Sequence, residues 1–244
     1  MFDLFRVKPY KSRLTPEEYE RYKSELGREI ERKLAFDIGV PDIRFDDKYR
    51  HIVLMNFDGC VTGGDTIVVP DGVTLVYVTK ESCEKYLDSS VLYSLILSDT
   101  VQYVDELPFN NMNVFDTNRL EAFRMNSIRL SAAFGCINTV ILRDTLRQEK
   151  CVGHYSVENL FYKFEKPYKI KGNQVFMIDS DGARTTNVFI DDKCLDVSLG
   201  KRPVHLYLCD GACKEPIRHK NKAVGVKSWN SNMEDELNKL LEEG

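Results

Sequence analysis

The sequence predicts an α/β protein with a mainly parallel central sheet that is flanked by helices, and with helical extensions at both ends. Two observations lead to this prediction. Residues 51–57 and 204–208 are nearly continuous apolar runs of strand length, which is the pattern of strands buried on both faces. The apolar residues of segment 118–133 predict a helix, residues 157–164 are expected to form another short helix, and strands that alternate with helices favour a parallel sheet with helices packed on it.

This interpretation divides the chain into three regions. A chain of 244 residues fits one core domain with a helical appendage at each end. We expect an N-terminal helical arm over residues 1–40, an α/β domain over residues 41–230 and a C-terminal helix over residues 231–244.

The segment Thr15-Pro16-Glu17-Glu18 predicts the start of the N-terminal helix. Thr15 can cap the helix, Pro16 suits its first position, and Glu18 completes a capping box. Down to residue 34, apolar residues recur every three or four positions: Tyr19, Tyr22, Leu26, Ile30 and Leu34. One narrow face of the helix is therefore apolar, and it packs either on its own domain or on a partner protein.

Turn signals predict two strand pairs in the core domain. Residues 66–69 and 73–78 flank Pro70-Asp71-Gly72 as a tight pair, and residues 173–178 and 186–190 bracket Ser180-Asp181-Gly182 as a hairpin. Residues 89–97 fit either a helix or a buried strand. No internal repeat is visible in the sequence.

Composition argues against several classes of partner. The net charge is −4, and the 34 basic residues are spread out, so we expect no nucleic-acid partner. The apolar runs are far shorter than the roughly 20 residues of a membrane-spanning helix. The first residues lack the pattern of a secretory signal, and the seven scattered cysteines suit reduced thiols, so we expect a cytoplasmic protein.

Polar residues follow two of the predicted buried strands. Asn56, Asp58, Gly59 and Cys60 come at the end of the first strand, and Cys209 and Asp210 come at the end of the second. In open α/β sheets, ligands gather beyond the carboxyl ends of the strands. These six residues are therefore the predicted binding cleft.

These two strand-end segments, together with residues 63–73, resemble the caspase-like fold of cysteine peptidases, in particular its adhesin-associated and large-DNA-virus relatives. In that family a strand ends in His-Gly, a Pro-x-Gly turn follows, and a later strand ends in the nucleophilic cysteine. The resemblance places Cys209 at the nucleophile and Asp58-Gly59 on the His-Gly pair, so Asp58 replaces the catalytic histidine. Because a nearby carboxylate raises the pKa of a thiol, the resemblance implies a fold that has lost its catalysis.

An active cysteine hydrolase is the first alternative. It would use Cys209 as the nucleophile and His154 or His219 as the base, because His51 and His205 lie at the starts of their strands. A buried structural thiol is the competing explanation of Cys209, since free cysteine is among the most commonly buried residue types.

A phosphatase is the second alternative, because residues 56–60 also resemble the first motif of haloacid dehalogenase-type phosphatases, Asp-x-Asp-Gly-Thr. Thr79 would match the second motif, and the acidic metal motif would be Asp191, Asp192 and Asp196. Asn56 stands at the nucleophile position, where an amide cannot form an aspartyl-phosphate. Asp191 and Asp192 otherwise close the predicted hairpin as a solvated turn.

The sequence therefore favours a non-catalytic binding or structural protein on a degenerate caspase-like fold. The expected partners are other proteins, bound through the N-terminal helix and the chain termini. A larger assembly, such as the particle of a large DNA virus, would be the setting. We expect no cofactor or metal, since Cys209 and Cys213 lack a second ligand pair at zinc spacing.

Overall fold

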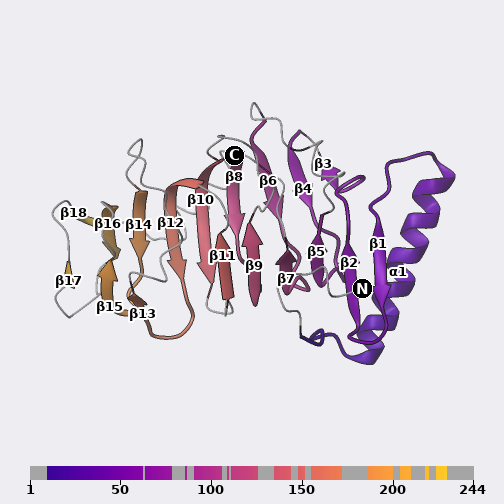
Figure 1. Cartoon of the computed structure of the whole chain (residues 1–244), viewed down its shortest axis with the longest axis horizontal. Coiled ribbons are helices and arrows are strands. Elements are labelled where there is room, and N and C mark those ends of the chain that lie inside the picture. Colours follow the sequence, from indigo (N-terminus) through magenta and orange to yellow (C-terminus); the bar gives the residue numbers. More distant parts are fainter. Residues whose placement is uncertain are drawn as a thin grey trace. The chain divides into compact units, whose positions relative to one another are not determined.

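Figure 1 shows the computed structural model, which describes residues 10–62, 64–78, 86, 91–105, 109, 111–125, 135–143, 148–151, 155–171, 186–199, 204–209, 218–219 and 224–229. The chain divides into two compact units. The first comprises residues 1–111, 118–133 and 145–153, and the second comprises residues 112–117, 134–144 and 154–244.

Helix α1 (Pro16–Ala35) confirms the predicted N-terminal helix. Its capping box is formed as expected: Glu18 N donates to the Thr15 hydroxyl at 3.2 Å, and Thr15 N donates to a Glu18 carboxylate oxygen at 2.8 Å. Tyr19 and Leu26 are buried on the inner face. The Tyr19 hydroxyl donates to Asp47 at 2.9 Å. The helix therefore packs on its own unit, which is the first of the two alternatives.

Replacing Thr15 with alanine should destabilise the first unit by about 1 kcal/mol, because the Glu18 amide would lose its acceptor at the helix start. Chemical unfolding followed by circular dichroism at 222 nm measures this loss. Ser24→Ala is the matched control, since Ser24 is exposed within α1 and alanine is the best helix former. Equal destabilisation by both substitutions would contradict the capping role.

The first unit contains a largely parallel sheet. Its strands run in the order β1 (Ile43–Asp46), β2 (His51–Leu54), β5 (Leu75–Tyr77), β7 (Tyr103–Asp105), β9 (Ala122–Met125) and β11 (Gln148–Cys151). Strand β1 pairs with β2 in antiparallel fashion, and the later pairs are parallel. We call this the first sheet.

Three further strands of the first unit belong to a different sheet. Strand β4 (Thr66–Val68) lies between β3 (Val61–Thr62) and β6 (Tyr93–Ile96), antiparallel to β3 and parallel to β6. Along the chain, β2, β4, β5, β6 and β7 alternate between this sheet and the first sheet. The chain therefore winds in successive coils, each of which contributes a strand to each sheet.

This winding builds the core of the first unit by stacking equivalent residues of successive coils. Val53, Leu75, Tyr103 and Ala122 are register partners on β2, β5, β7 and β9. Together with Met55 they form one cluster of buried apolar side chains. Each coil buries its apolar surface against its neighbours, as in repeat architectures.

The second unit has the same alternating path. Its main sheet runs in the order β18 (Val224–Trp229), β16 (Val204–Cys209), β14 (Thr186–Ile190), β12 (Tyr155–Lys163), β10 (Gly135–Arg143) and β8 (Asn111–Asp116, in this unit from residue 112). A smaller sheet holds β13 (Tyr168–Lys171), β15 (Cys194–Leu199) and β17 (Arg218–His219). Every pair of neighbouring strands in these two sheets for which a register is defined is parallel. From β12 to β18 the chain alternates between the two sheets.

Stacked side chains also form the core of the second unit. Ile141, Phe161 and Phe189 are register partners on β10, β12 and β14, and they cluster with Val114. The Phe161 and Phe189 rings are parallel within 6° and their centroids lie 4.2 Å apart. Tyr207 on β16 continues the stack at 4.6 Å from Phe189.

The predicted α/β class and the predominance of parallel strands are confirmed, but the predicted flanking helices are wrong where the chain is described. Strand β9 lies within residues 118–133, and β12 occupies residues 157–164. Val157, Leu160 and Phe161 have the spacing of a helix face although they lie on a strand. The reason is that β12 is buried on both faces, so its apolar residues do not alternate with polar ones. Residues 89–97 contain a strand, β6.

The predicted tight pair of residues 66–69 with 73–78 is also wrong. The turn signal itself is correct, since Val73 N donates to Pro70 O at 3.3 Å. The turn leads the chain from one sheet to the other: β4 pairs with β3 and β6, and β5 pairs with β2 and β7. Residues 173–178 and the C-terminal segment 231–244 lie outside the described residues.

No α-helix in the described part of the chain is long and apolar enough to cross a membrane.

Candidate functional site

Residues 56–60, the first half of the predicted cleft, form a tight turn directly after β2. The Asn56 side-chain oxygen accepts hydrogen bonds from Asp42 N and Asp58 N, both at 3.0 Å. Cys60 N donates to Phe57 O at 2.9 Å and closes the turn. The Asn56 side chain thus holds two backbone segments together, which is a structural role.

Gly59 fixes this turn against the chain that follows α1. Its backbone has a φ of +70°, which favours glycine, and an added Cβ would lie 2.1 Å from Gly39 O. The Lys33 ammonium donates to Gly59 O at 3.0 Å. The turn is therefore fastened to the C-terminal end of α1 by both packing and a hydrogen bond.

Cys60 is a buried thiol rather than a reactive one. It is 3% exposed. Burial raises the pKa of Cys60 from 9.0 to about 11, and the opposing effect of Lys33 and the further increase from Asp58 are smaller. At neutral pH this thiol is protonated, so Cys60 lacks the thiolate that nucleophilic catalysis requires.

The second half of the predicted cleft lies on a different sheet. Cys209 is the last residue of β16, in the main sheet of the second unit, whereas residues 56–60 follow β2 of the first sheet. The sequence predicted that both strand ends lie at the edge of one parallel sheet. In the structure they belong to different sheets. His219 lies on β17 of a third sheet. Asp210 and His154 lie outside the described residues, so a pairing of Cys209 with a histidine stays a prediction.

The residues of the phosphatase alternative are also distributed over separate elements. Asp191 and Asp192 form the turn between β14 and β15, Asp196 lies on β15, and Thr79 is outside the described residues. The Asp191 side chain accepts from Lys193 N at 3.0 Å, and burial raises the pKa of its carboxyl. Among the described residues, no group of three or more His, Cys, Asp or Glu side chains is arranged to bind a metal ion.

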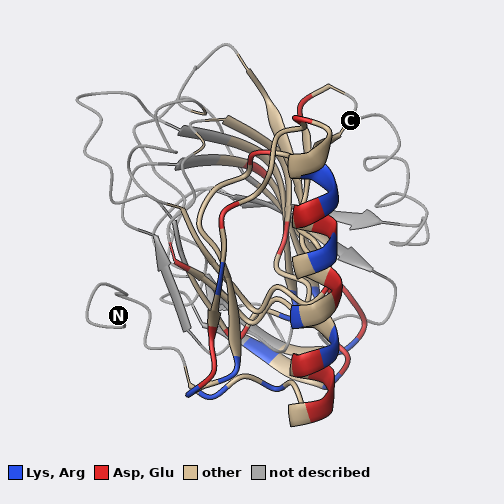
Figure 2. Ribbon diagram, turned by 90° about the vertical axis from the view of Figure 1, so that its right-hand side faces the viewer, with Lys and Arg blue, Asp and Glu red and all other residues tan. Residues whose placement is uncertain are grey.

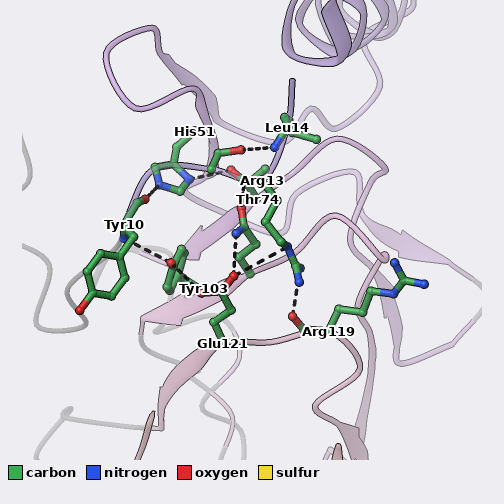
Figure 3. A network of polar contacts seen from close by, with 10 residues as sticks. Tyr10, Arg13, Leu14, His51, Thr74, Tyr103, Arg119 and Glu121 are labelled. Carbon is green, nitrogen blue, oxygen red and sulfur yellow. Dashed lines mark hydrogen bonds and ion pairs between the residues drawn. The ribbon is translucent and has the colours of Figure 1, made fainter. Parts of the chain in front are cut away.

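A polar network that the sequence reading missed joins the segment before α1 to the first sheet (Figure 3). We call residues 10–14 the strap. Ser12 N donates to Tyr49 O at 2.9 Å, and Arg50 Nε donates to Leu14 O at 3.0 Å. Ser12 and Leu14 are buried, whereas the Tyr10 side chain is exposed.

Polar residues that precede successive strands of the first sheet hold the strap, two of them directly and Thr74 through His51. Thr74, Gln102 and Glu121 come directly before β5, β7 and β9. Arg13 N donates to Gln102 Oε1 at 2.8 Å, and Gln102 Nε2 donates to Glu121 at 3.1 Å. The guanidinium of Arg13 lies 3.8 Å from Glu121. One residue from each coil thus contributes to a continuous polar row under the strap.

His51 anchors the first residue of the strap. Its Nε2 is hydrogen-bonded to Tyr10 O, its Nδ1 lies 3.0 Å from the Thr74 hydroxyl, and its ring packs edge-on against Tyr103 with centroids 5.7 Å apart. The Tyr103 hydroxyl accepts from Tyr10 N at 3.2 Å. The side chain of His51 is fully buried, and this burial lowers its pKa.

A sequence signal for this network existed. Polar residues stand immediately before three short apolar strands, at Thr74, Gln102 and Glu121. Their equivalence became visible only through the strand register, because the spacing between them differs from coil to coil.

Comparisons with family models, with curated proteins and with solved structures find no match to this chain.

Proposed function

We propose that this chain is a non-catalytic binding or structural protein that acts as a component of a larger protein assembly. The observation that carries the proposal is the structure of the 56–60 turn, which the sequence predicted as one half of a binding cleft without a catalytic histidine. Asn56 and Gly59 serve the fold, and Cys60 carries a buried, neutral thiol. The functional groups of this turn are used to join β2 to the end of α1.

The proposal does not require a caspase-like fold. The resemblance expects the two motif segments on one parallel sheet, whereas β2 and β16 belong to different sheets. What supports the binding role is the architecture itself, since stacked coils present long, regular surfaces that repeat proteins use for binding. Incorporation into the particle of a large DNA virus remains part of the proposal, and it depends on the family resemblance alone.

The surface offered to protein partners includes the N-terminal helix. Figure 2 shows α1 along the outside of its unit, with acidic and basic residues mixed over its exposed face. At the end of the helix, three apolar residues are exposed, Leu34 at 63%, Phe36 at 70% and Ile38 at 49%. Side chains of this kind at a surface are typical anchors of protein–protein contacts.

Thiol reactivity tests the non-catalytic assignment. Native Cys60 should react with iodoacetamide at pH 8 at least about 100-fold more slowly than in the unfolded chain, because its pKa of about 11 leaves little thiolate and its side chain is buried. Mass spectrometry of the labelled peptides measures the rate at each cysteine. The Cys60→Ser variant shows which part of the total labelling comes from Cys60.

The same experiment tests the hydrolase alternative. Fast, pH-dependent labelling of Cys209 that His154→Ala or His219→Ala abolishes would establish an activated thiol and refute the proposal. Labelling of Cys209 no faster than in the unfolded chain supports the binding role.

A further inference from the structure

The strap and α1 together form one segment, residues 10–35, which we call the strap–helix segment. Tyr19 and Leu26 are the buried residues of its helix. Hydrogen bonds and an ion pair fasten the segment to the coils at its start, its middle and its end. These contacts join Arg13 to Gln102, Lys23 to Asp47 and Lys33 to Gly59. All three partners come later in the chain than residue 38, so the contacts do not depend on which copy of the chain supplies the segment.

Residues 36–38 connect the strap–helix segment to the coils and form a tight turn at the end of α1. Asp37 N donates to Leu34 O at 3.2 Å, and Ile38 N donates to Lys33 O at 3.0 Å. The turn requires a φ of +53° at Asp37, in the left-handed region that favours glycine. The closed connection is therefore strained at this residue, and opening of the turn relieves the strain.

The same connection carries exposed apolar side chains. Leu34 is 63% exposed, Phe36 is 70% exposed and Ile38 is 49% exposed. The outer face of α1 instead carries mixed acidic and basic residues (Figure 2). Clustered apolar side chains at a surface gain stability when another molecule covers them. The apolar surface available to a partner therefore coincides with the turn that can open.

We propose that two copies of this chain form a dimer by exchanging their strap–helix segments, with residues 36–38 as the hinge. Each segment makes with the other copy the contacts that it makes here within one chain. The two hinges run past each other in the symmetric dimer, so Leu34, Phe36 and Ile38 of one copy cover those of the other. The proposal rests on the assembly role proposed above, and it names the partner as a second copy of the chain.

The balance between monomer and dimer depends on the terms that differ between them, because exchange retains the contacts of the segment. The dimer gains the burial of the apolar hinge and loses the strain at Asp37. The monomer avoids the entropy cost of association. The hinge residues therefore determine the dissociation constant of the dimer.

The ion pair between Lys23 and Asp47 allows a direct test in the full chain. The ammonium lies 2.7 Å from the carboxylate, and the two side chains are 33% and 74% exposed, so a carbodiimide can couple them into an amide. Unlabelled and isotopically heavy chains are mixed in urea, refolded together and separated by size. Mass spectrometry of the dimer should find that about half of the coupled Lys23–Asp47 peptide pairs join a light peptide to a heavy one.

Two results of this experiment would overturn the exchange. One is a dimer in which every coupled pair comes from a single chain. The other is a chain that light scattering shows to remain a monomer of 28.2 kDa at concentrations up to about 100 μM.

Two substitutions of Asp37 test the hinge without a refolding step. Asp37→Gly accepts the left-handed conformation, so it should favour the closed monomer and raise the dissociation constant by at least about tenfold. Asp37→Ala disfavours that conformation and should lower the constant by a similar factor. Analytical ultracentrifugation measures both constants. Equal dissociation constants for the two variants would refute the role of the hinge.

A matched pair of variants tests the apolar contact. Phe36→Ser should raise the dissociation constant by at least about tenfold, because each hinge of the dimer loses a ring. Leu195→Ser is the control, since Leu195 is 49% exposed on β15 of the second unit and should leave the constant unchanged. Equal weakening by both substitutions would contradict the proposal. A monomeric chain overturns the exchange alone, whereas fast labelling of Cys209 overturns the proposed function.

Discussion

Replacing Gly59 with alanine should destabilise the first unit by about 3 kcal/mol, which is the largest effect expected for an added methyl group at any glycine in the described part of the chain. Two causes combine. The φ of +70° is unfavourable for a residue with a Cβ, and that Cβ would lie 2.1 Å from the carbonyl oxygen of Gly39. A backbone atom cannot move aside as the end of a flexible side chain can, so the 39–41 segment must shift away from the turn.

Urea unfolding followed by circular dichroism at 222 nm measures this loss, since α1 is the α-helix of the described residues and belongs to the first unit. The midpoint should fall by roughly 1–2 M. Gly27→Ala is the matched control. Gly27 lies within α1, and an added Cβ there meets no atom within 4 Å, so alanine should stabilise the helix by about 0.5–1 kcal/mol. A Gly59→Ala midpoint equal to that of the wild type would show that the turn is not fastened to residues 39–41 as described.

Replacing Phe161 with alanine should destabilise the second unit by about 3–5 kcal/mol. Phe161 is fully buried, stacks on Phe189 at 4.2 Å, and clusters with Val114 and Ile141. Truncation removes the most deeply buried ring of this stack and leaves a cavity between β10 and β14. Neighbouring strands of a parallel sheet are held at fixed spacing by their hydrogen bonds, so the site cannot collapse to fill it.

The single tryptophan reports on this unit, because Trp229 is the last residue of β18. Its fluorescence during urea unfolding should shift to a lower midpoint in Phe161→Ala. Phe189→Leu is the control: Phe189 is only half-buried and leucine retains apolar volume, so the loss should be about 1 kcal/mol. Similar losses for the two variants would show that the buried Phe161 ring contributes no more to stability than the half-buried Phe189 ring.

Local signals in the sequence predicted several elements correctly. The helix start at Thr15 and the strands near residues 51–57 and 204–208 were predicted from patterns that involve only neighbouring residues: a capping box and continuous apolar runs. The predominance of parallel strands followed from the double-sided burial that such runs indicate. Each of these features depends on backbone propensity or on burial, which a short window of sequence records.

The coiled path was not predictable in the same way. Successive coils differ in length: the register partners Val53, Leu75, Tyr103 and Ala122 are separated by unequal numbers of residues. No fixed period therefore appears in the sequence, although the strands stack as repeats. Because no repeat is visible, the sequence alone predicts one parallel sheet with helices packed on it. For the same reason it predicts a tight strand pair around the turn at residues 70–72.

The sequence by itself determined the helix, its cap and the positions of the most apolar strands. Only the tertiary structure decided which strands are neighbours, that Asn56 and Gly59 hold a turn rather than a ligand, and that His51 meets the strap. The reason is physical: capping and burial act over a few residues, whereas strand pairing and side-chain networks join residues far apart in the chain, and their partners depend on coil lengths that no local pattern encodes.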